Sequence, residues 1–243
     1  MISLGRGKYK ASFARDAGDI AACQALRQLA FHRADGADAD AFDPICHHVM
    51  VQDVASGTLV ASYRLLLIRT GRDIAESYSA QFYNLAALEA FEGPMVEMGR
   101  FCVHPDHPDP DIIRIAWAAL TCFVDSEGVK MLFGCASFQG TEAAAYTDAF
   151  AILKARHLAP KRWLPRVKAP NVFRFAKLLR GEANLRAGML RMPPLLRTYL
   201  TMGGWVSDHA VVDAKMNTLH VFTGLEIAAI PPARARLLRA VAG

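Results

Sequence analysis

Apolar residues recur along this chain with two periods, and the period changes several times. Runs of apolar and β-branched residues predict five strands, at residues 8–14, 48–53, 58–68, 95–103 and within 129–138. Apolar residues at helical spacing predict helices over residues 16–32, 111–127 and 141–156. Asp16 is a candidate cap for the first helix. Gly57 and Gly128 stand where a hairpin turn and a helix end favour glycine.

This order of elements, β-α-β-β-β-α-β-α, predicts an α/β (α+β) fold with a mixed central sheet flanked by helices. The length of 243 residues suits a single domain over residues 1–243. The pattern is weaker in the remaining segments. There we expect a mobile acidic loop at 34–43, irregular or weakly helical structure at 70–93, a helix over 173–190, closing strands at 205–212 and 218–227, and a small basic helix at 231–243.

Composition adds limits on the class of protein. Apolar residues make up 53% of the chain and charged residues 21%, which excludes gross disorder. The longest apolar stretch without a charge, IAWAALTCFV at 115–124, is far shorter than the roughly 20 residues that a membrane-spanning helix needs. The first residues, MISLGRGKYK, lack the apolar core of a signal peptide, so we expect a cytoplasmic protein. Five cysteines without CxxC spacing favour neither a disulfide framework nor a zinc ribbon.

Several segments carry a more specific pattern. They read FDPICHHVMVQD (42–53), GTLVASYRLL (57–66), EMGRFCVHPDH (97–107), FGCASF (133–138) and PPLLRTYLTMGGWVSDHAVVDAKMNT (193–218). With these segments nearly the whole chain resembles the bacterial ornithine Nα-acyltransferases of the GNAT superfamily. The resemblance implies an enzyme that moves a 3-hydroxyacyl group from acyl carrier protein to the α-amine of ornithine, giving lyso-ornithine lipid. Glutamine, lysine or glycine remain open as alternative acceptors. It also implies a peripheral position at the inner membrane.

A second, more distant similarity is to the acyl-homoserine-lactone synthases. It rests on six residues that occur in a similar order, namely Arg27, Phe31, Asp43, Arg64, Glu97 and Arg100. In that family the charged members of the set form a cluster of ion pairs around the substrate, and the resemblance implies the same role here. This chain has Gly99 where those synthases often have a serine. If the chain were such a synthase, it would need S-adenosylmethionine.

Forming an amide from a thioester requires a base for the amine and a donor for the oxyanion. Glu97, in the strand over 95–103, is the candidate base through a water, with Arg100 as its catalytic partner. The alternative is that Glu97 only forms an ion pair with Arg100. Backbone N–H groups between Phe101 and Val103 are candidates for the oxyanion site.

The amino-acid substrate brings a carboxylate and a second cation. Arg64 could bind the carboxylate through its guanidinium fork. Asp43, or a neighbour in the acidic loop, could meet the side-chain amine. We favour a solvated loop for the remaining aspartates there, Asp35, Asp38 and Asp40.

Two other chemistries are less well supported by the sequence. Cys102 is a weak candidate for an acyl-enzyme nucleophile, because adjacency to His104 does not establish geometry. Alternation along a strand sends His47 and His48 to opposite faces, so no metal site is expected.

The donor is suggested by what one segment lacks. GNAT enzymes that use coenzyme A hold its pyrophosphate with a glycine-rich loop that opens a helix. Here that place reads CVHPDHPDPDIIR (102–114) and contains no glycine. We therefore expect no bound cofactor, and an acyl donor carried on the 4'-phosphopantetheine of acyl carrier protein.

Basic residues are concentrated in residues 154–191, which carry eleven Lys or Arg and one acid, Glu182. The segment has a net charge of +10 and the rest of the chain about −5. We expect a basic helical insertion or docking segment, with its dock at Lys161, Arg162, Arg166, Lys168, Arg174, Lys177 and Arg180.

Several partners of this segment remain open. One is the acidic acyl carrier protein. Another is an anionic membrane, contacted through the apolar residues Trp163, Leu164, Phe173, Phe175, Leu178 and Leu179. Nucleic acid ranks last, because no nucleic-acid-binding motif accompanies the charge. A merely solvated basic face, and a peripheral membrane protein without catalysis, are the remaining alternatives.

Overall fold

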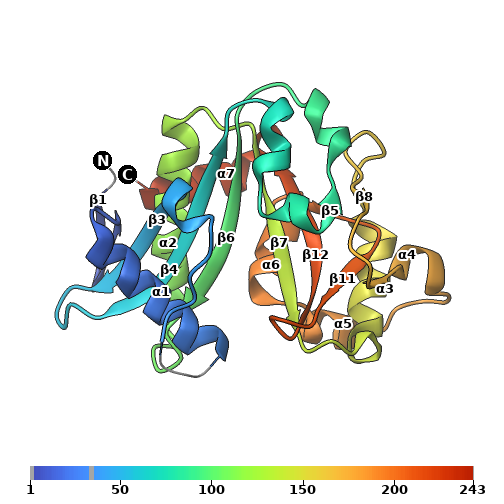
Figure 1. Cartoon of the computed structure of the whole chain (residues 1–243), viewed down its shortest axis with the longest axis horizontal. Coiled ribbons are helices and arrows are strands. Elements are labelled where there is room, and N and C mark those ends of the chain that lie inside the picture. The colour runs from blue at the N-terminus through green and yellow to red at the C-terminus, as the bar shows by residue number, and fades with distance from the viewer. Residues whose placement is uncertain (1–2, 33–35, 243) are drawn as a thin grey trace. The chain divides into compact units, whose positions relative to one another are not determined.

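The computed structural model describes residues 3–32 and 36–242. Its internal contacts divide the chain into two compact units (Figure 1). Unit 1 comprises Met1–Leu67, Val96–Val129 and Pro232–Gly243, and unit 2 comprises Ile68–Met95 and Lys130–Pro231. Both units combine strands with helices, so the predicted α/β (α+β) class is confirmed. Among the described residues, no helix has both the length and the apolar character needed to cross a bilayer.

The sheet of unit 1 has the strand order β1-β2-β3-β4-β6. These strands are β1 (Ser3–Arg6), β2 (Tyr9–Phe13), β3 (His47–Asp53), β4 (Leu59–Ile68) and β6 (Met95–Val103). All but β1 match predicted strands; β1 is a short edge strand that the apolar pattern does not reveal. The register of β3 on β4 places His48 directly opposite Arg64. Gly57 has φ +72° in the turn between these strands, as its position predicts.

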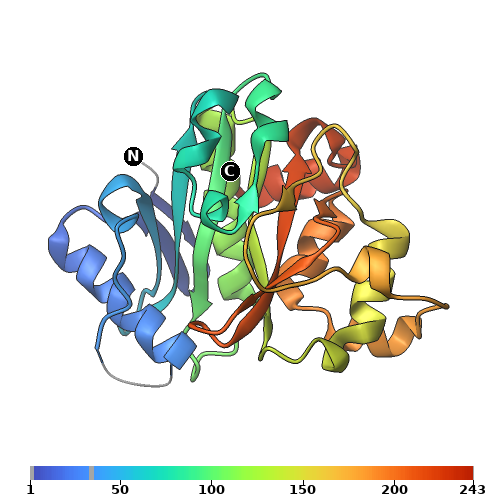
Figure 2. The ribbon, with the colours of Figure 1, turned by 45° about the vertical axis from the view of Figure 1, so that its right-hand side comes forward.

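Two long helices cover opposite faces of this sheet. They are α1 (Ala17–His32) and α2 (Pro110–Ser126), both close to their predicted bounds, and α1 is the blue helix in Figure 2. Strand alternation explains how both can pack on β4. The hydroxyl of Tyr63 donates to the carbonyl of Ala116 on α2, whereas the next residue, Arg64, contacts the segment that follows α1. The C-terminal helix α7 (Pro232–Ala242) is also as predicted, and its Arg239 pairs with Asp125 of α2.

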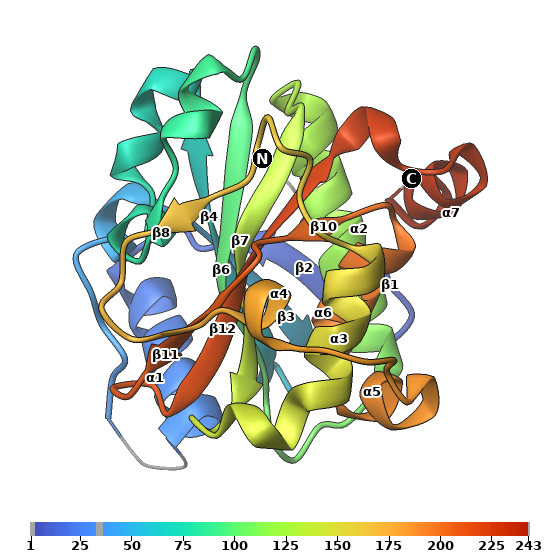
Figure 3. The ribbon, with the colours of Figure 1, turned by 90° about the vertical axis from the view of Figure 1, so that its right-hand side faces the viewer.

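Unit 2 is built on four antiparallel strands in the order β7-β12-β11-β9, with β10 also paired to β12. These are β7 (Met131–Gln139), β9 (Val172–Phe173), β10 (Trp205–Val206), β11 (Ala210–Asp213) and β12 (Thr218–Glu226). The closing strand predicted at 218–227 is confirmed, whereas the one predicted at 205–212 is two short strands, β10 and β11, with a break between them. Figure 3 shows the helices beside them, which are α3 (Thr147–Arg156), α4 (Phe175–Leu178), α5 (Leu185–Arg191) and α6 (Pro194–Thr201). Phe150 and Phe175 stack in the core between helices and sheet, with ring centroids 5.1 Å apart.

Short elements fill the rest of the chain. The 3-10 helices are η1 (Asp43–Ile45), η2 (Gly71–Glu76), η3 (Ser79–Gln81), η4 (Ala86–Ala90), η5 (Ala143–Tyr146) and η6 (Ile227–Ala229). A separate two-stranded ladder joins β5 (Tyr83–Asn84) to β8 (Arg166–Val167). The prediction of irregular or weakly helical structure at 70–93 is thus confirmed.

The single helix predicted over 173–190 is wrong. The chain forms a two-residue strand at β9, one turn of helix at α4 and a separate helix at α5. Leu179 is extended, and Gly181 has a left-handed φ of +83°, so the helix cannot continue between them. The ammonium group of Lys154 donates to the carbonyl of Leu179 and holds the chain at this break.

Candidate active site

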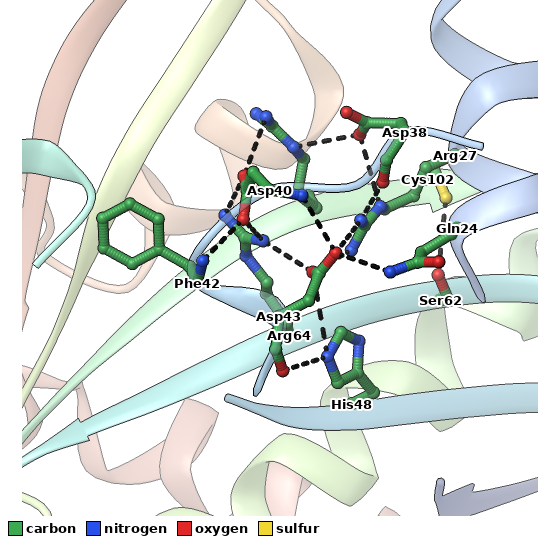
Figure 4. A network of polar contacts seen from close by, with 11 residues as sticks. Gln24, Arg27, Asp38, Asp40, Phe42, Asp43, His48, Ser62, Arg64 and Cys102 are labelled. Carbon is green, nitrogen blue, oxygen red and sulfur yellow. Dashed lines mark hydrogen bonds and ion pairs between the residues drawn. The ribbon is translucent and has the colours of Figure 1, made fainter. Parts of the chain in front are cut away.

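Three arginines and three aspartates form one network in unit 1 (Figure 4). The arginines come from three elements, Arg27 from α1, Arg64 from β4 and Arg100 from β6. The aspartates, Asp38, Asp40 and Asp43, all come from the segment that follows α1. The structure therefore brings together four of the six residues in the predicted cluster, Arg27, Asp43, Arg64 and Arg100.

Asp43 lies at the centre of the network and is only 4% exposed. Its carboxylate accepts hydrogen bonds from Arg27 at 2.8 Å, from Arg64 at 2.8 Å and from the Gln24 amide at 2.9 Å. Burial opposes ionisation, but the hydrogen bonds and the charge of Arg27 outweigh it and hold the pKa of Asp43 well below its usual range. Beneath it, the His48 ring lies 3.0 Å from the Asp43 carbonyl, and burial lowers the pKa of that ring. The Asp43 carboxylate at the centre of the network is therefore ionised at neutral pH.

Asp40 occupies the guanidinium fork of Arg64. The two nitrogens of the fork lie 2.5 and 2.8 Å from the two carboxylate oxygens of Asp40, and Arg100 reaches the same carboxylate at 3.2 Å. Burial raises the pKa of Asp40, but the bonds from Arg64 outweigh it and the pKa is lowered overall. Arg64 itself is buried, and Asp40 keeps its pKa above the ordinary value for arginine. Arg64 therefore meets an internal carboxylate in the geometry that we predicted for a substrate carboxylate.

The prediction of a solvated loop is wrong for Asp38 and Asp40. Their side chains are 11% and 23% exposed, and both form ion pairs with buried or half-buried arginines. Asp38 also accepts from Arg27 through its backbone carbonyl. An acidic, alanine- and glycine-rich stretch is typical of a solvated loop, but three arginines on the sheet and helix require carboxylate partners when they are buried. Asp35 lies outside the described residues.

Glu97 and Arg100 both lie on β6, and Glu97 is buried with 4% exposure. Arg100 has φ +54°, a conformation that interrupts the alternation of a strand as a bulge does. In a regular strand residues 97 and 100 would lie on opposite faces, so an interruption of this kind is needed if both side chains are to act on one face. Gly99 lies against Arg64, since a Cβ there would stand 3.7 Å from the Nε atom of Arg64.

The charges of Glu97 and of the network both act on the Cys46 thiol. Burial raises the pKa of the Cys46 thiol to about 12. Arg64 opposes this shift, whereas the negative charges of Glu97, Asp40 and Asp43 add to it. The thiol therefore lies within the field of both the network and the candidate base.

The remaining predicted site residues are half-buried. Phe31 is near the end of α1, one helical turn beyond Arg27. Phe101 stacks on Tyr63 with ring centroids 5.5 Å apart, and Val103 ends β6. Roles of these residues toward a substrate stay predictions.

Cys102 has the environment of a structural thiol. It is 4% exposed and lies 3.6 Å from the Ser62 hydroxyl. Burial raises the pKa of its thiol to about 11, so the nucleophilic thiolate is scarce near neutral pH. His47 is exposed whereas His48 is buried, as alternation predicts.

The segment before α2 uses its own backbone donors. Pro105, Pro108 and Pro110 have no N–H group. The other four N–H groups of the segment all donate within it. Those of residues 106 and 107 donate to the Nδ1 atom and the carbonyl of His104, and those of residues 109 and 111 donate to the His107 carbonyl and the Asp109 carboxylate. Asp109 caps the helix and also binds Lys8 and Tyr9, and these donors lower its pKa to about 2. The N-terminus of α2 is therefore occupied by a carboxylate of the chain itself.

All seven residues of the predicted dock are exposed, namely Lys161, Arg162, Arg166, Lys168, Arg174, Lys177 and Arg180. Two of them also have partners in unit 2. Arg162 lies 3.3 Å from the Glu226 carboxylate, and the Lys168 ammonium group donates to the Ala80 carbonyl at 2.6 Å. The apolar residues named beside them are not a surface: Phe175 is fully buried and Trp163 packs on Phe91, so of the six only Leu178 is exposed.

Comparison with known proteins identifies the family to which this chain belongs. Residues 23–118 match the model described as an acetyltransferase (GNAT) domain. An L-ornithine N(alpha)-acyltransferase of Rhodobacter capsulatus is 36% identical over 230 residues, which cover 88% of each chain. The chain belongs to the family of these acyltransferases.

Two further comparisons support this assignment of the acyltransferase. The L-ornithine N(alpha)-acyltransferase of Brucella abortus is 30% identical over 246 residues, covering 93% of this chain and 87% of the relative. The solved structure of FeeM, an N-acyl amino acid synthase from uncultured soil microbes, has a TM-score of 0.54 at 8% identity. The match covers 90% of this chain and 92% of FeeM. Together with the match to the GNAT domain model, it confirms the GNAT fold predicted for the enzyme.

The sequence did not identify four members of the acyltransferase network. They are Gln24, Asp38, Asp40 and His48. A signal was available for the two aspartates, because three arginines fall in predicted buried elements and only Asp43 had been assigned to them. Gln24 and His48 carry no comparable signal in a single sequence.

Proposed function

We propose that the enzyme transfers a 3-hydroxyacyl group from acyl carrier protein to the α-amine of L-ornithine, giving lyso-ornithine lipid. The names of the relatives support ornithine as the acceptor. The observation that carries the proposal is the buried charge network, in which three arginines are balanced by three aspartates. Glu97 adds one further carboxyl group to this balanced network, and ornithine has one net positive charge at neutral pH.

Asp40 is the acceptor contact that this arrangement favours. Its side chain is the most exposed of the three aspartates in the network. Arg64 and Arg100 hold its carboxylate in place, so it can accept from the side-chain ammonium of ornithine without reorganising. Binding of the substrate carboxylate by Arg64, the alternative, would require Asp40 to leave the fork.

Glu97 is the base of the proposed reaction. An α-amino group is largely protonated near neutral pH, so it must lose a proton before it attacks. Glu97 takes that proton through a water, and the free amine adds to the thioester carbonyl. Backbone N–H groups between Phe101 and Val103 stabilise the oxyanion. As the intermediate collapses, the C–S bond breaks and the phosphopantetheine thiolate leaves, taking up the second proton that the attacking nitrogen loses as the amide forms.

A carrier-bound donor suits the segment before α2. Coenzyme A binding at this place requires free backbone N–H groups at the start of the helix. Between Pro105 and Asp111 the N–H groups are bonded within the chain or missing at prolines, and Asp109 places a negative charge at the helix end. A pyrophosphate would meet repulsion there, whereas the phosphopantetheine arm of a carrier has no pyrophosphate to place. A position at the inner membrane would follow from the lipid product.

The test uses purified full-length protein, 3-hydroxyacyl-carrier protein and a panel of free amino acids, with products identified by mass spectrometry. We expect acylated ornithine, and no product when S-adenosylmethionine replaces the amino acid. Glu97→Gln should lower kcat about 100-fold or more with little change in KM, because removing a general base typically costs this much. Glu142→Gln, an exposed carboxylate of unit 2, is the matched control. A product with another amino acid alone would overturn the acceptor, and full activity of Glu97→Gln would overturn the base.

A further inference from the structure

The helix α5 presents an apolar and basic surface to solvent. Among the described residues eight large apolar side chains are exposed, and three of them, Leu185, Met189 and Leu190, belong to this one helix of seven residues. Leu190 is 81% exposed, the highest value of the eight. Single exposed apolar residues are common on proteins, but several on one short helix are the mark of an interaction surface.

The helix is anchored so that these side chains cannot turn inward. Gly188 is buried against α3, and a Cβ there would stand 2.5 Å from Ile152 and 2.8 Å from the Asp148 carbonyl. Met192, one turn further, is also buried. At the N-terminus, Asn184 caps the helix through the Ala187 N–H, and its own N–H donates to Asp148. Residues on the opposite side of the helix, Arg186 and Leu190, must therefore point to solvent.

The charges around this surface have one sign. Arg186 and Arg191 are exposed on α5 itself, and Lys177 and Arg180 are exposed just before it. Between Glu182 and Asp208 the chain has no acidic residue. A protein partner of ordinary composition would not select for this pairing, whereas anionic lipid offers negative headgroups directly above an apolar layer.

We propose that α5 docks on the surface of an anionic lipid bilayer, with Leu185, Met189 and Leu190 entering the acyl boundary. Arg186 and Arg191 would contact the headgroups. This inference rests on the proposed function in one respect: a lipid product must pass from the enzyme into a bilayer. The vesicle-binding assay below contains no acyl donor or acceptor, so its failure and the failure of the proposed reaction are separate results.

Binding is measured by co-flotation of the purified full chain with phosphatidylcholine vesicles, with and without phosphatidylglycerol. We expect binding to the anionic vesicles only. The pair Leu185→Ser and Leu190→Ser should lower the partition coefficient roughly tenfold or more, because two apolar side chains no longer leave water. The pair Arg186→Gln and Arg191→Gln should lower it about fivefold for each charge removed. Val54→Ser and Arg72→Gln, exposed positions outside the surface, should bind as the parent chain does.

Four results would overturn the proposal. The first is absence of binding by the parent chain, and the second is equal binding to neutral vesicles. The third is vesicle binding unchanged in the arginine pair together with a raised KM for the carrier-bound donor, which would assign the surface to the carrier. The fourth is a dimer in light scattering that the leucine pair converts to a monomer, which would assign it to a second copy of the chain. Circular dichroism and thermal unfolding confirm that each variant remains folded.

Discussion

The exposure and contacts of single residues indicate which charged group of the network is available to the proposed substrate. Arg64 is 3% exposed and its fork is held by Asp40, so its guanidinium is part of the scaffold. Asp40 remains the accessible member, because it sits at the edge of the network while Asp43 lies at its centre. In the proposed reaction the acceptor contact is therefore assigned to Asp40, and Arg64, which the sequence singled out, holds that aspartate in place.

Asp40→Asn should weaken acceptor binding. The amide keeps the size of the side chain but removes the charge that would meet the ornithine ammonium. A hydrogen bond to a charged group is worth about 1.5–3 kcal/mol, which corresponds to roughly a 10- to 100-fold rise in KM for ornithine. The KM for the acyl donor should stay within about twofold, since the donor does not use this contact. Steady-state kinetics with each substrate varied separately measure both values, and equal rises for donor and acceptor would indicate a general loss of structure instead.

The sequence predicted part of this network, and physical reasons set the limit. Arg27, Asp43, Arg64 and Arg100 were named from the resemblance to acyl-homoserine-lactone synthases, and for Arg64 its place in an apolar strand also indicated a partner. Asp38 and Asp40 were missed although the arginines left without an assigned carboxylate were a signal, because the same acidic stretch suits either a solvated loop or a set of buried ion pairs. Only the path of the chain after α1 decides between them, and that path depends on tertiary contacts.

Elements follow the sequence where their burial is regular. Strand β12 is buried on both faces and pairs with β7 and β11, and its apolar run predicted it. The region 173–190 has helical residues but lies against α3 and β11, and packing there breaks it at Leu179 and Gly181. Tertiary packing overrides a local preference that is worth only a fraction of a kcal/mol per residue.

Strand β12 also carries a histidine that should make unit 2 sensitive to acid. His220 is 3% exposed, and the Tyr83 hydroxyl lies 3.1 Å from its Nδ1 atom. Burial lowers the pKa of His220 to about 4, the charge of His209 adds to the shift, and Asp213 opposes it. The unfolded chain binds this proton near pH 6.5. At pH values between about 4 and 6.5, unfolding is therefore accompanied by uptake of a proton at His220. The free energy of unfolding consequently falls as the pH falls from 7 to 5.

His220→Gln should remove that dependence. The site contributes a loss of about 2 kcal/mol between pH 7 and pH 5 in the parent chain, and the variant should lack this part of the loss. Urea unfolding at the two pH values measures it, and the comparison is between the two differences, because the substitution also changes stability at pH 7. His32→Gln, at an exposed position at the end of α1, serves as the control. An unchanged pH difference in His220→Gln would contradict the assignment.

For the whole molecule, the distribution of charge sets the expected partner. The net charge is +5, and the residues of unit 1 carry −1 while those of unit 2 carry +6. The excess is concentrated in residues 154–191, and all seven residues of the predicted dock are exposed. A one-sided surface of this kind raises the rate of encounter with an acidic protein, and salt screens the effect.

Turnover with a carrier-bound donor should therefore fall steeply with salt when no vesicles are present. Raising the ionic strength from about 0.05 to about 0.5 M shortens the screening length severalfold, and kcat/KM for 3-hydroxyacyl-carrier protein should drop about tenfold or more. The same acyl group on free pantetheine presents no protein charge, so its kcat/KM should change little over this range. The triple variant Lys161→Gln, Arg166→Gln and Arg174→Gln should flatten the salt dependence, because these side chains are exposed and have neither the Glu226 contact of Arg162 nor the Ala80 contact of Lys168. Arg114→Gln, an exposed arginine of unit 1, should leave the slope as it is. If both donors respond alike to salt, the charge of unit 2 does not serve the carrier, and the carrier must be recognised through apolar contacts instead.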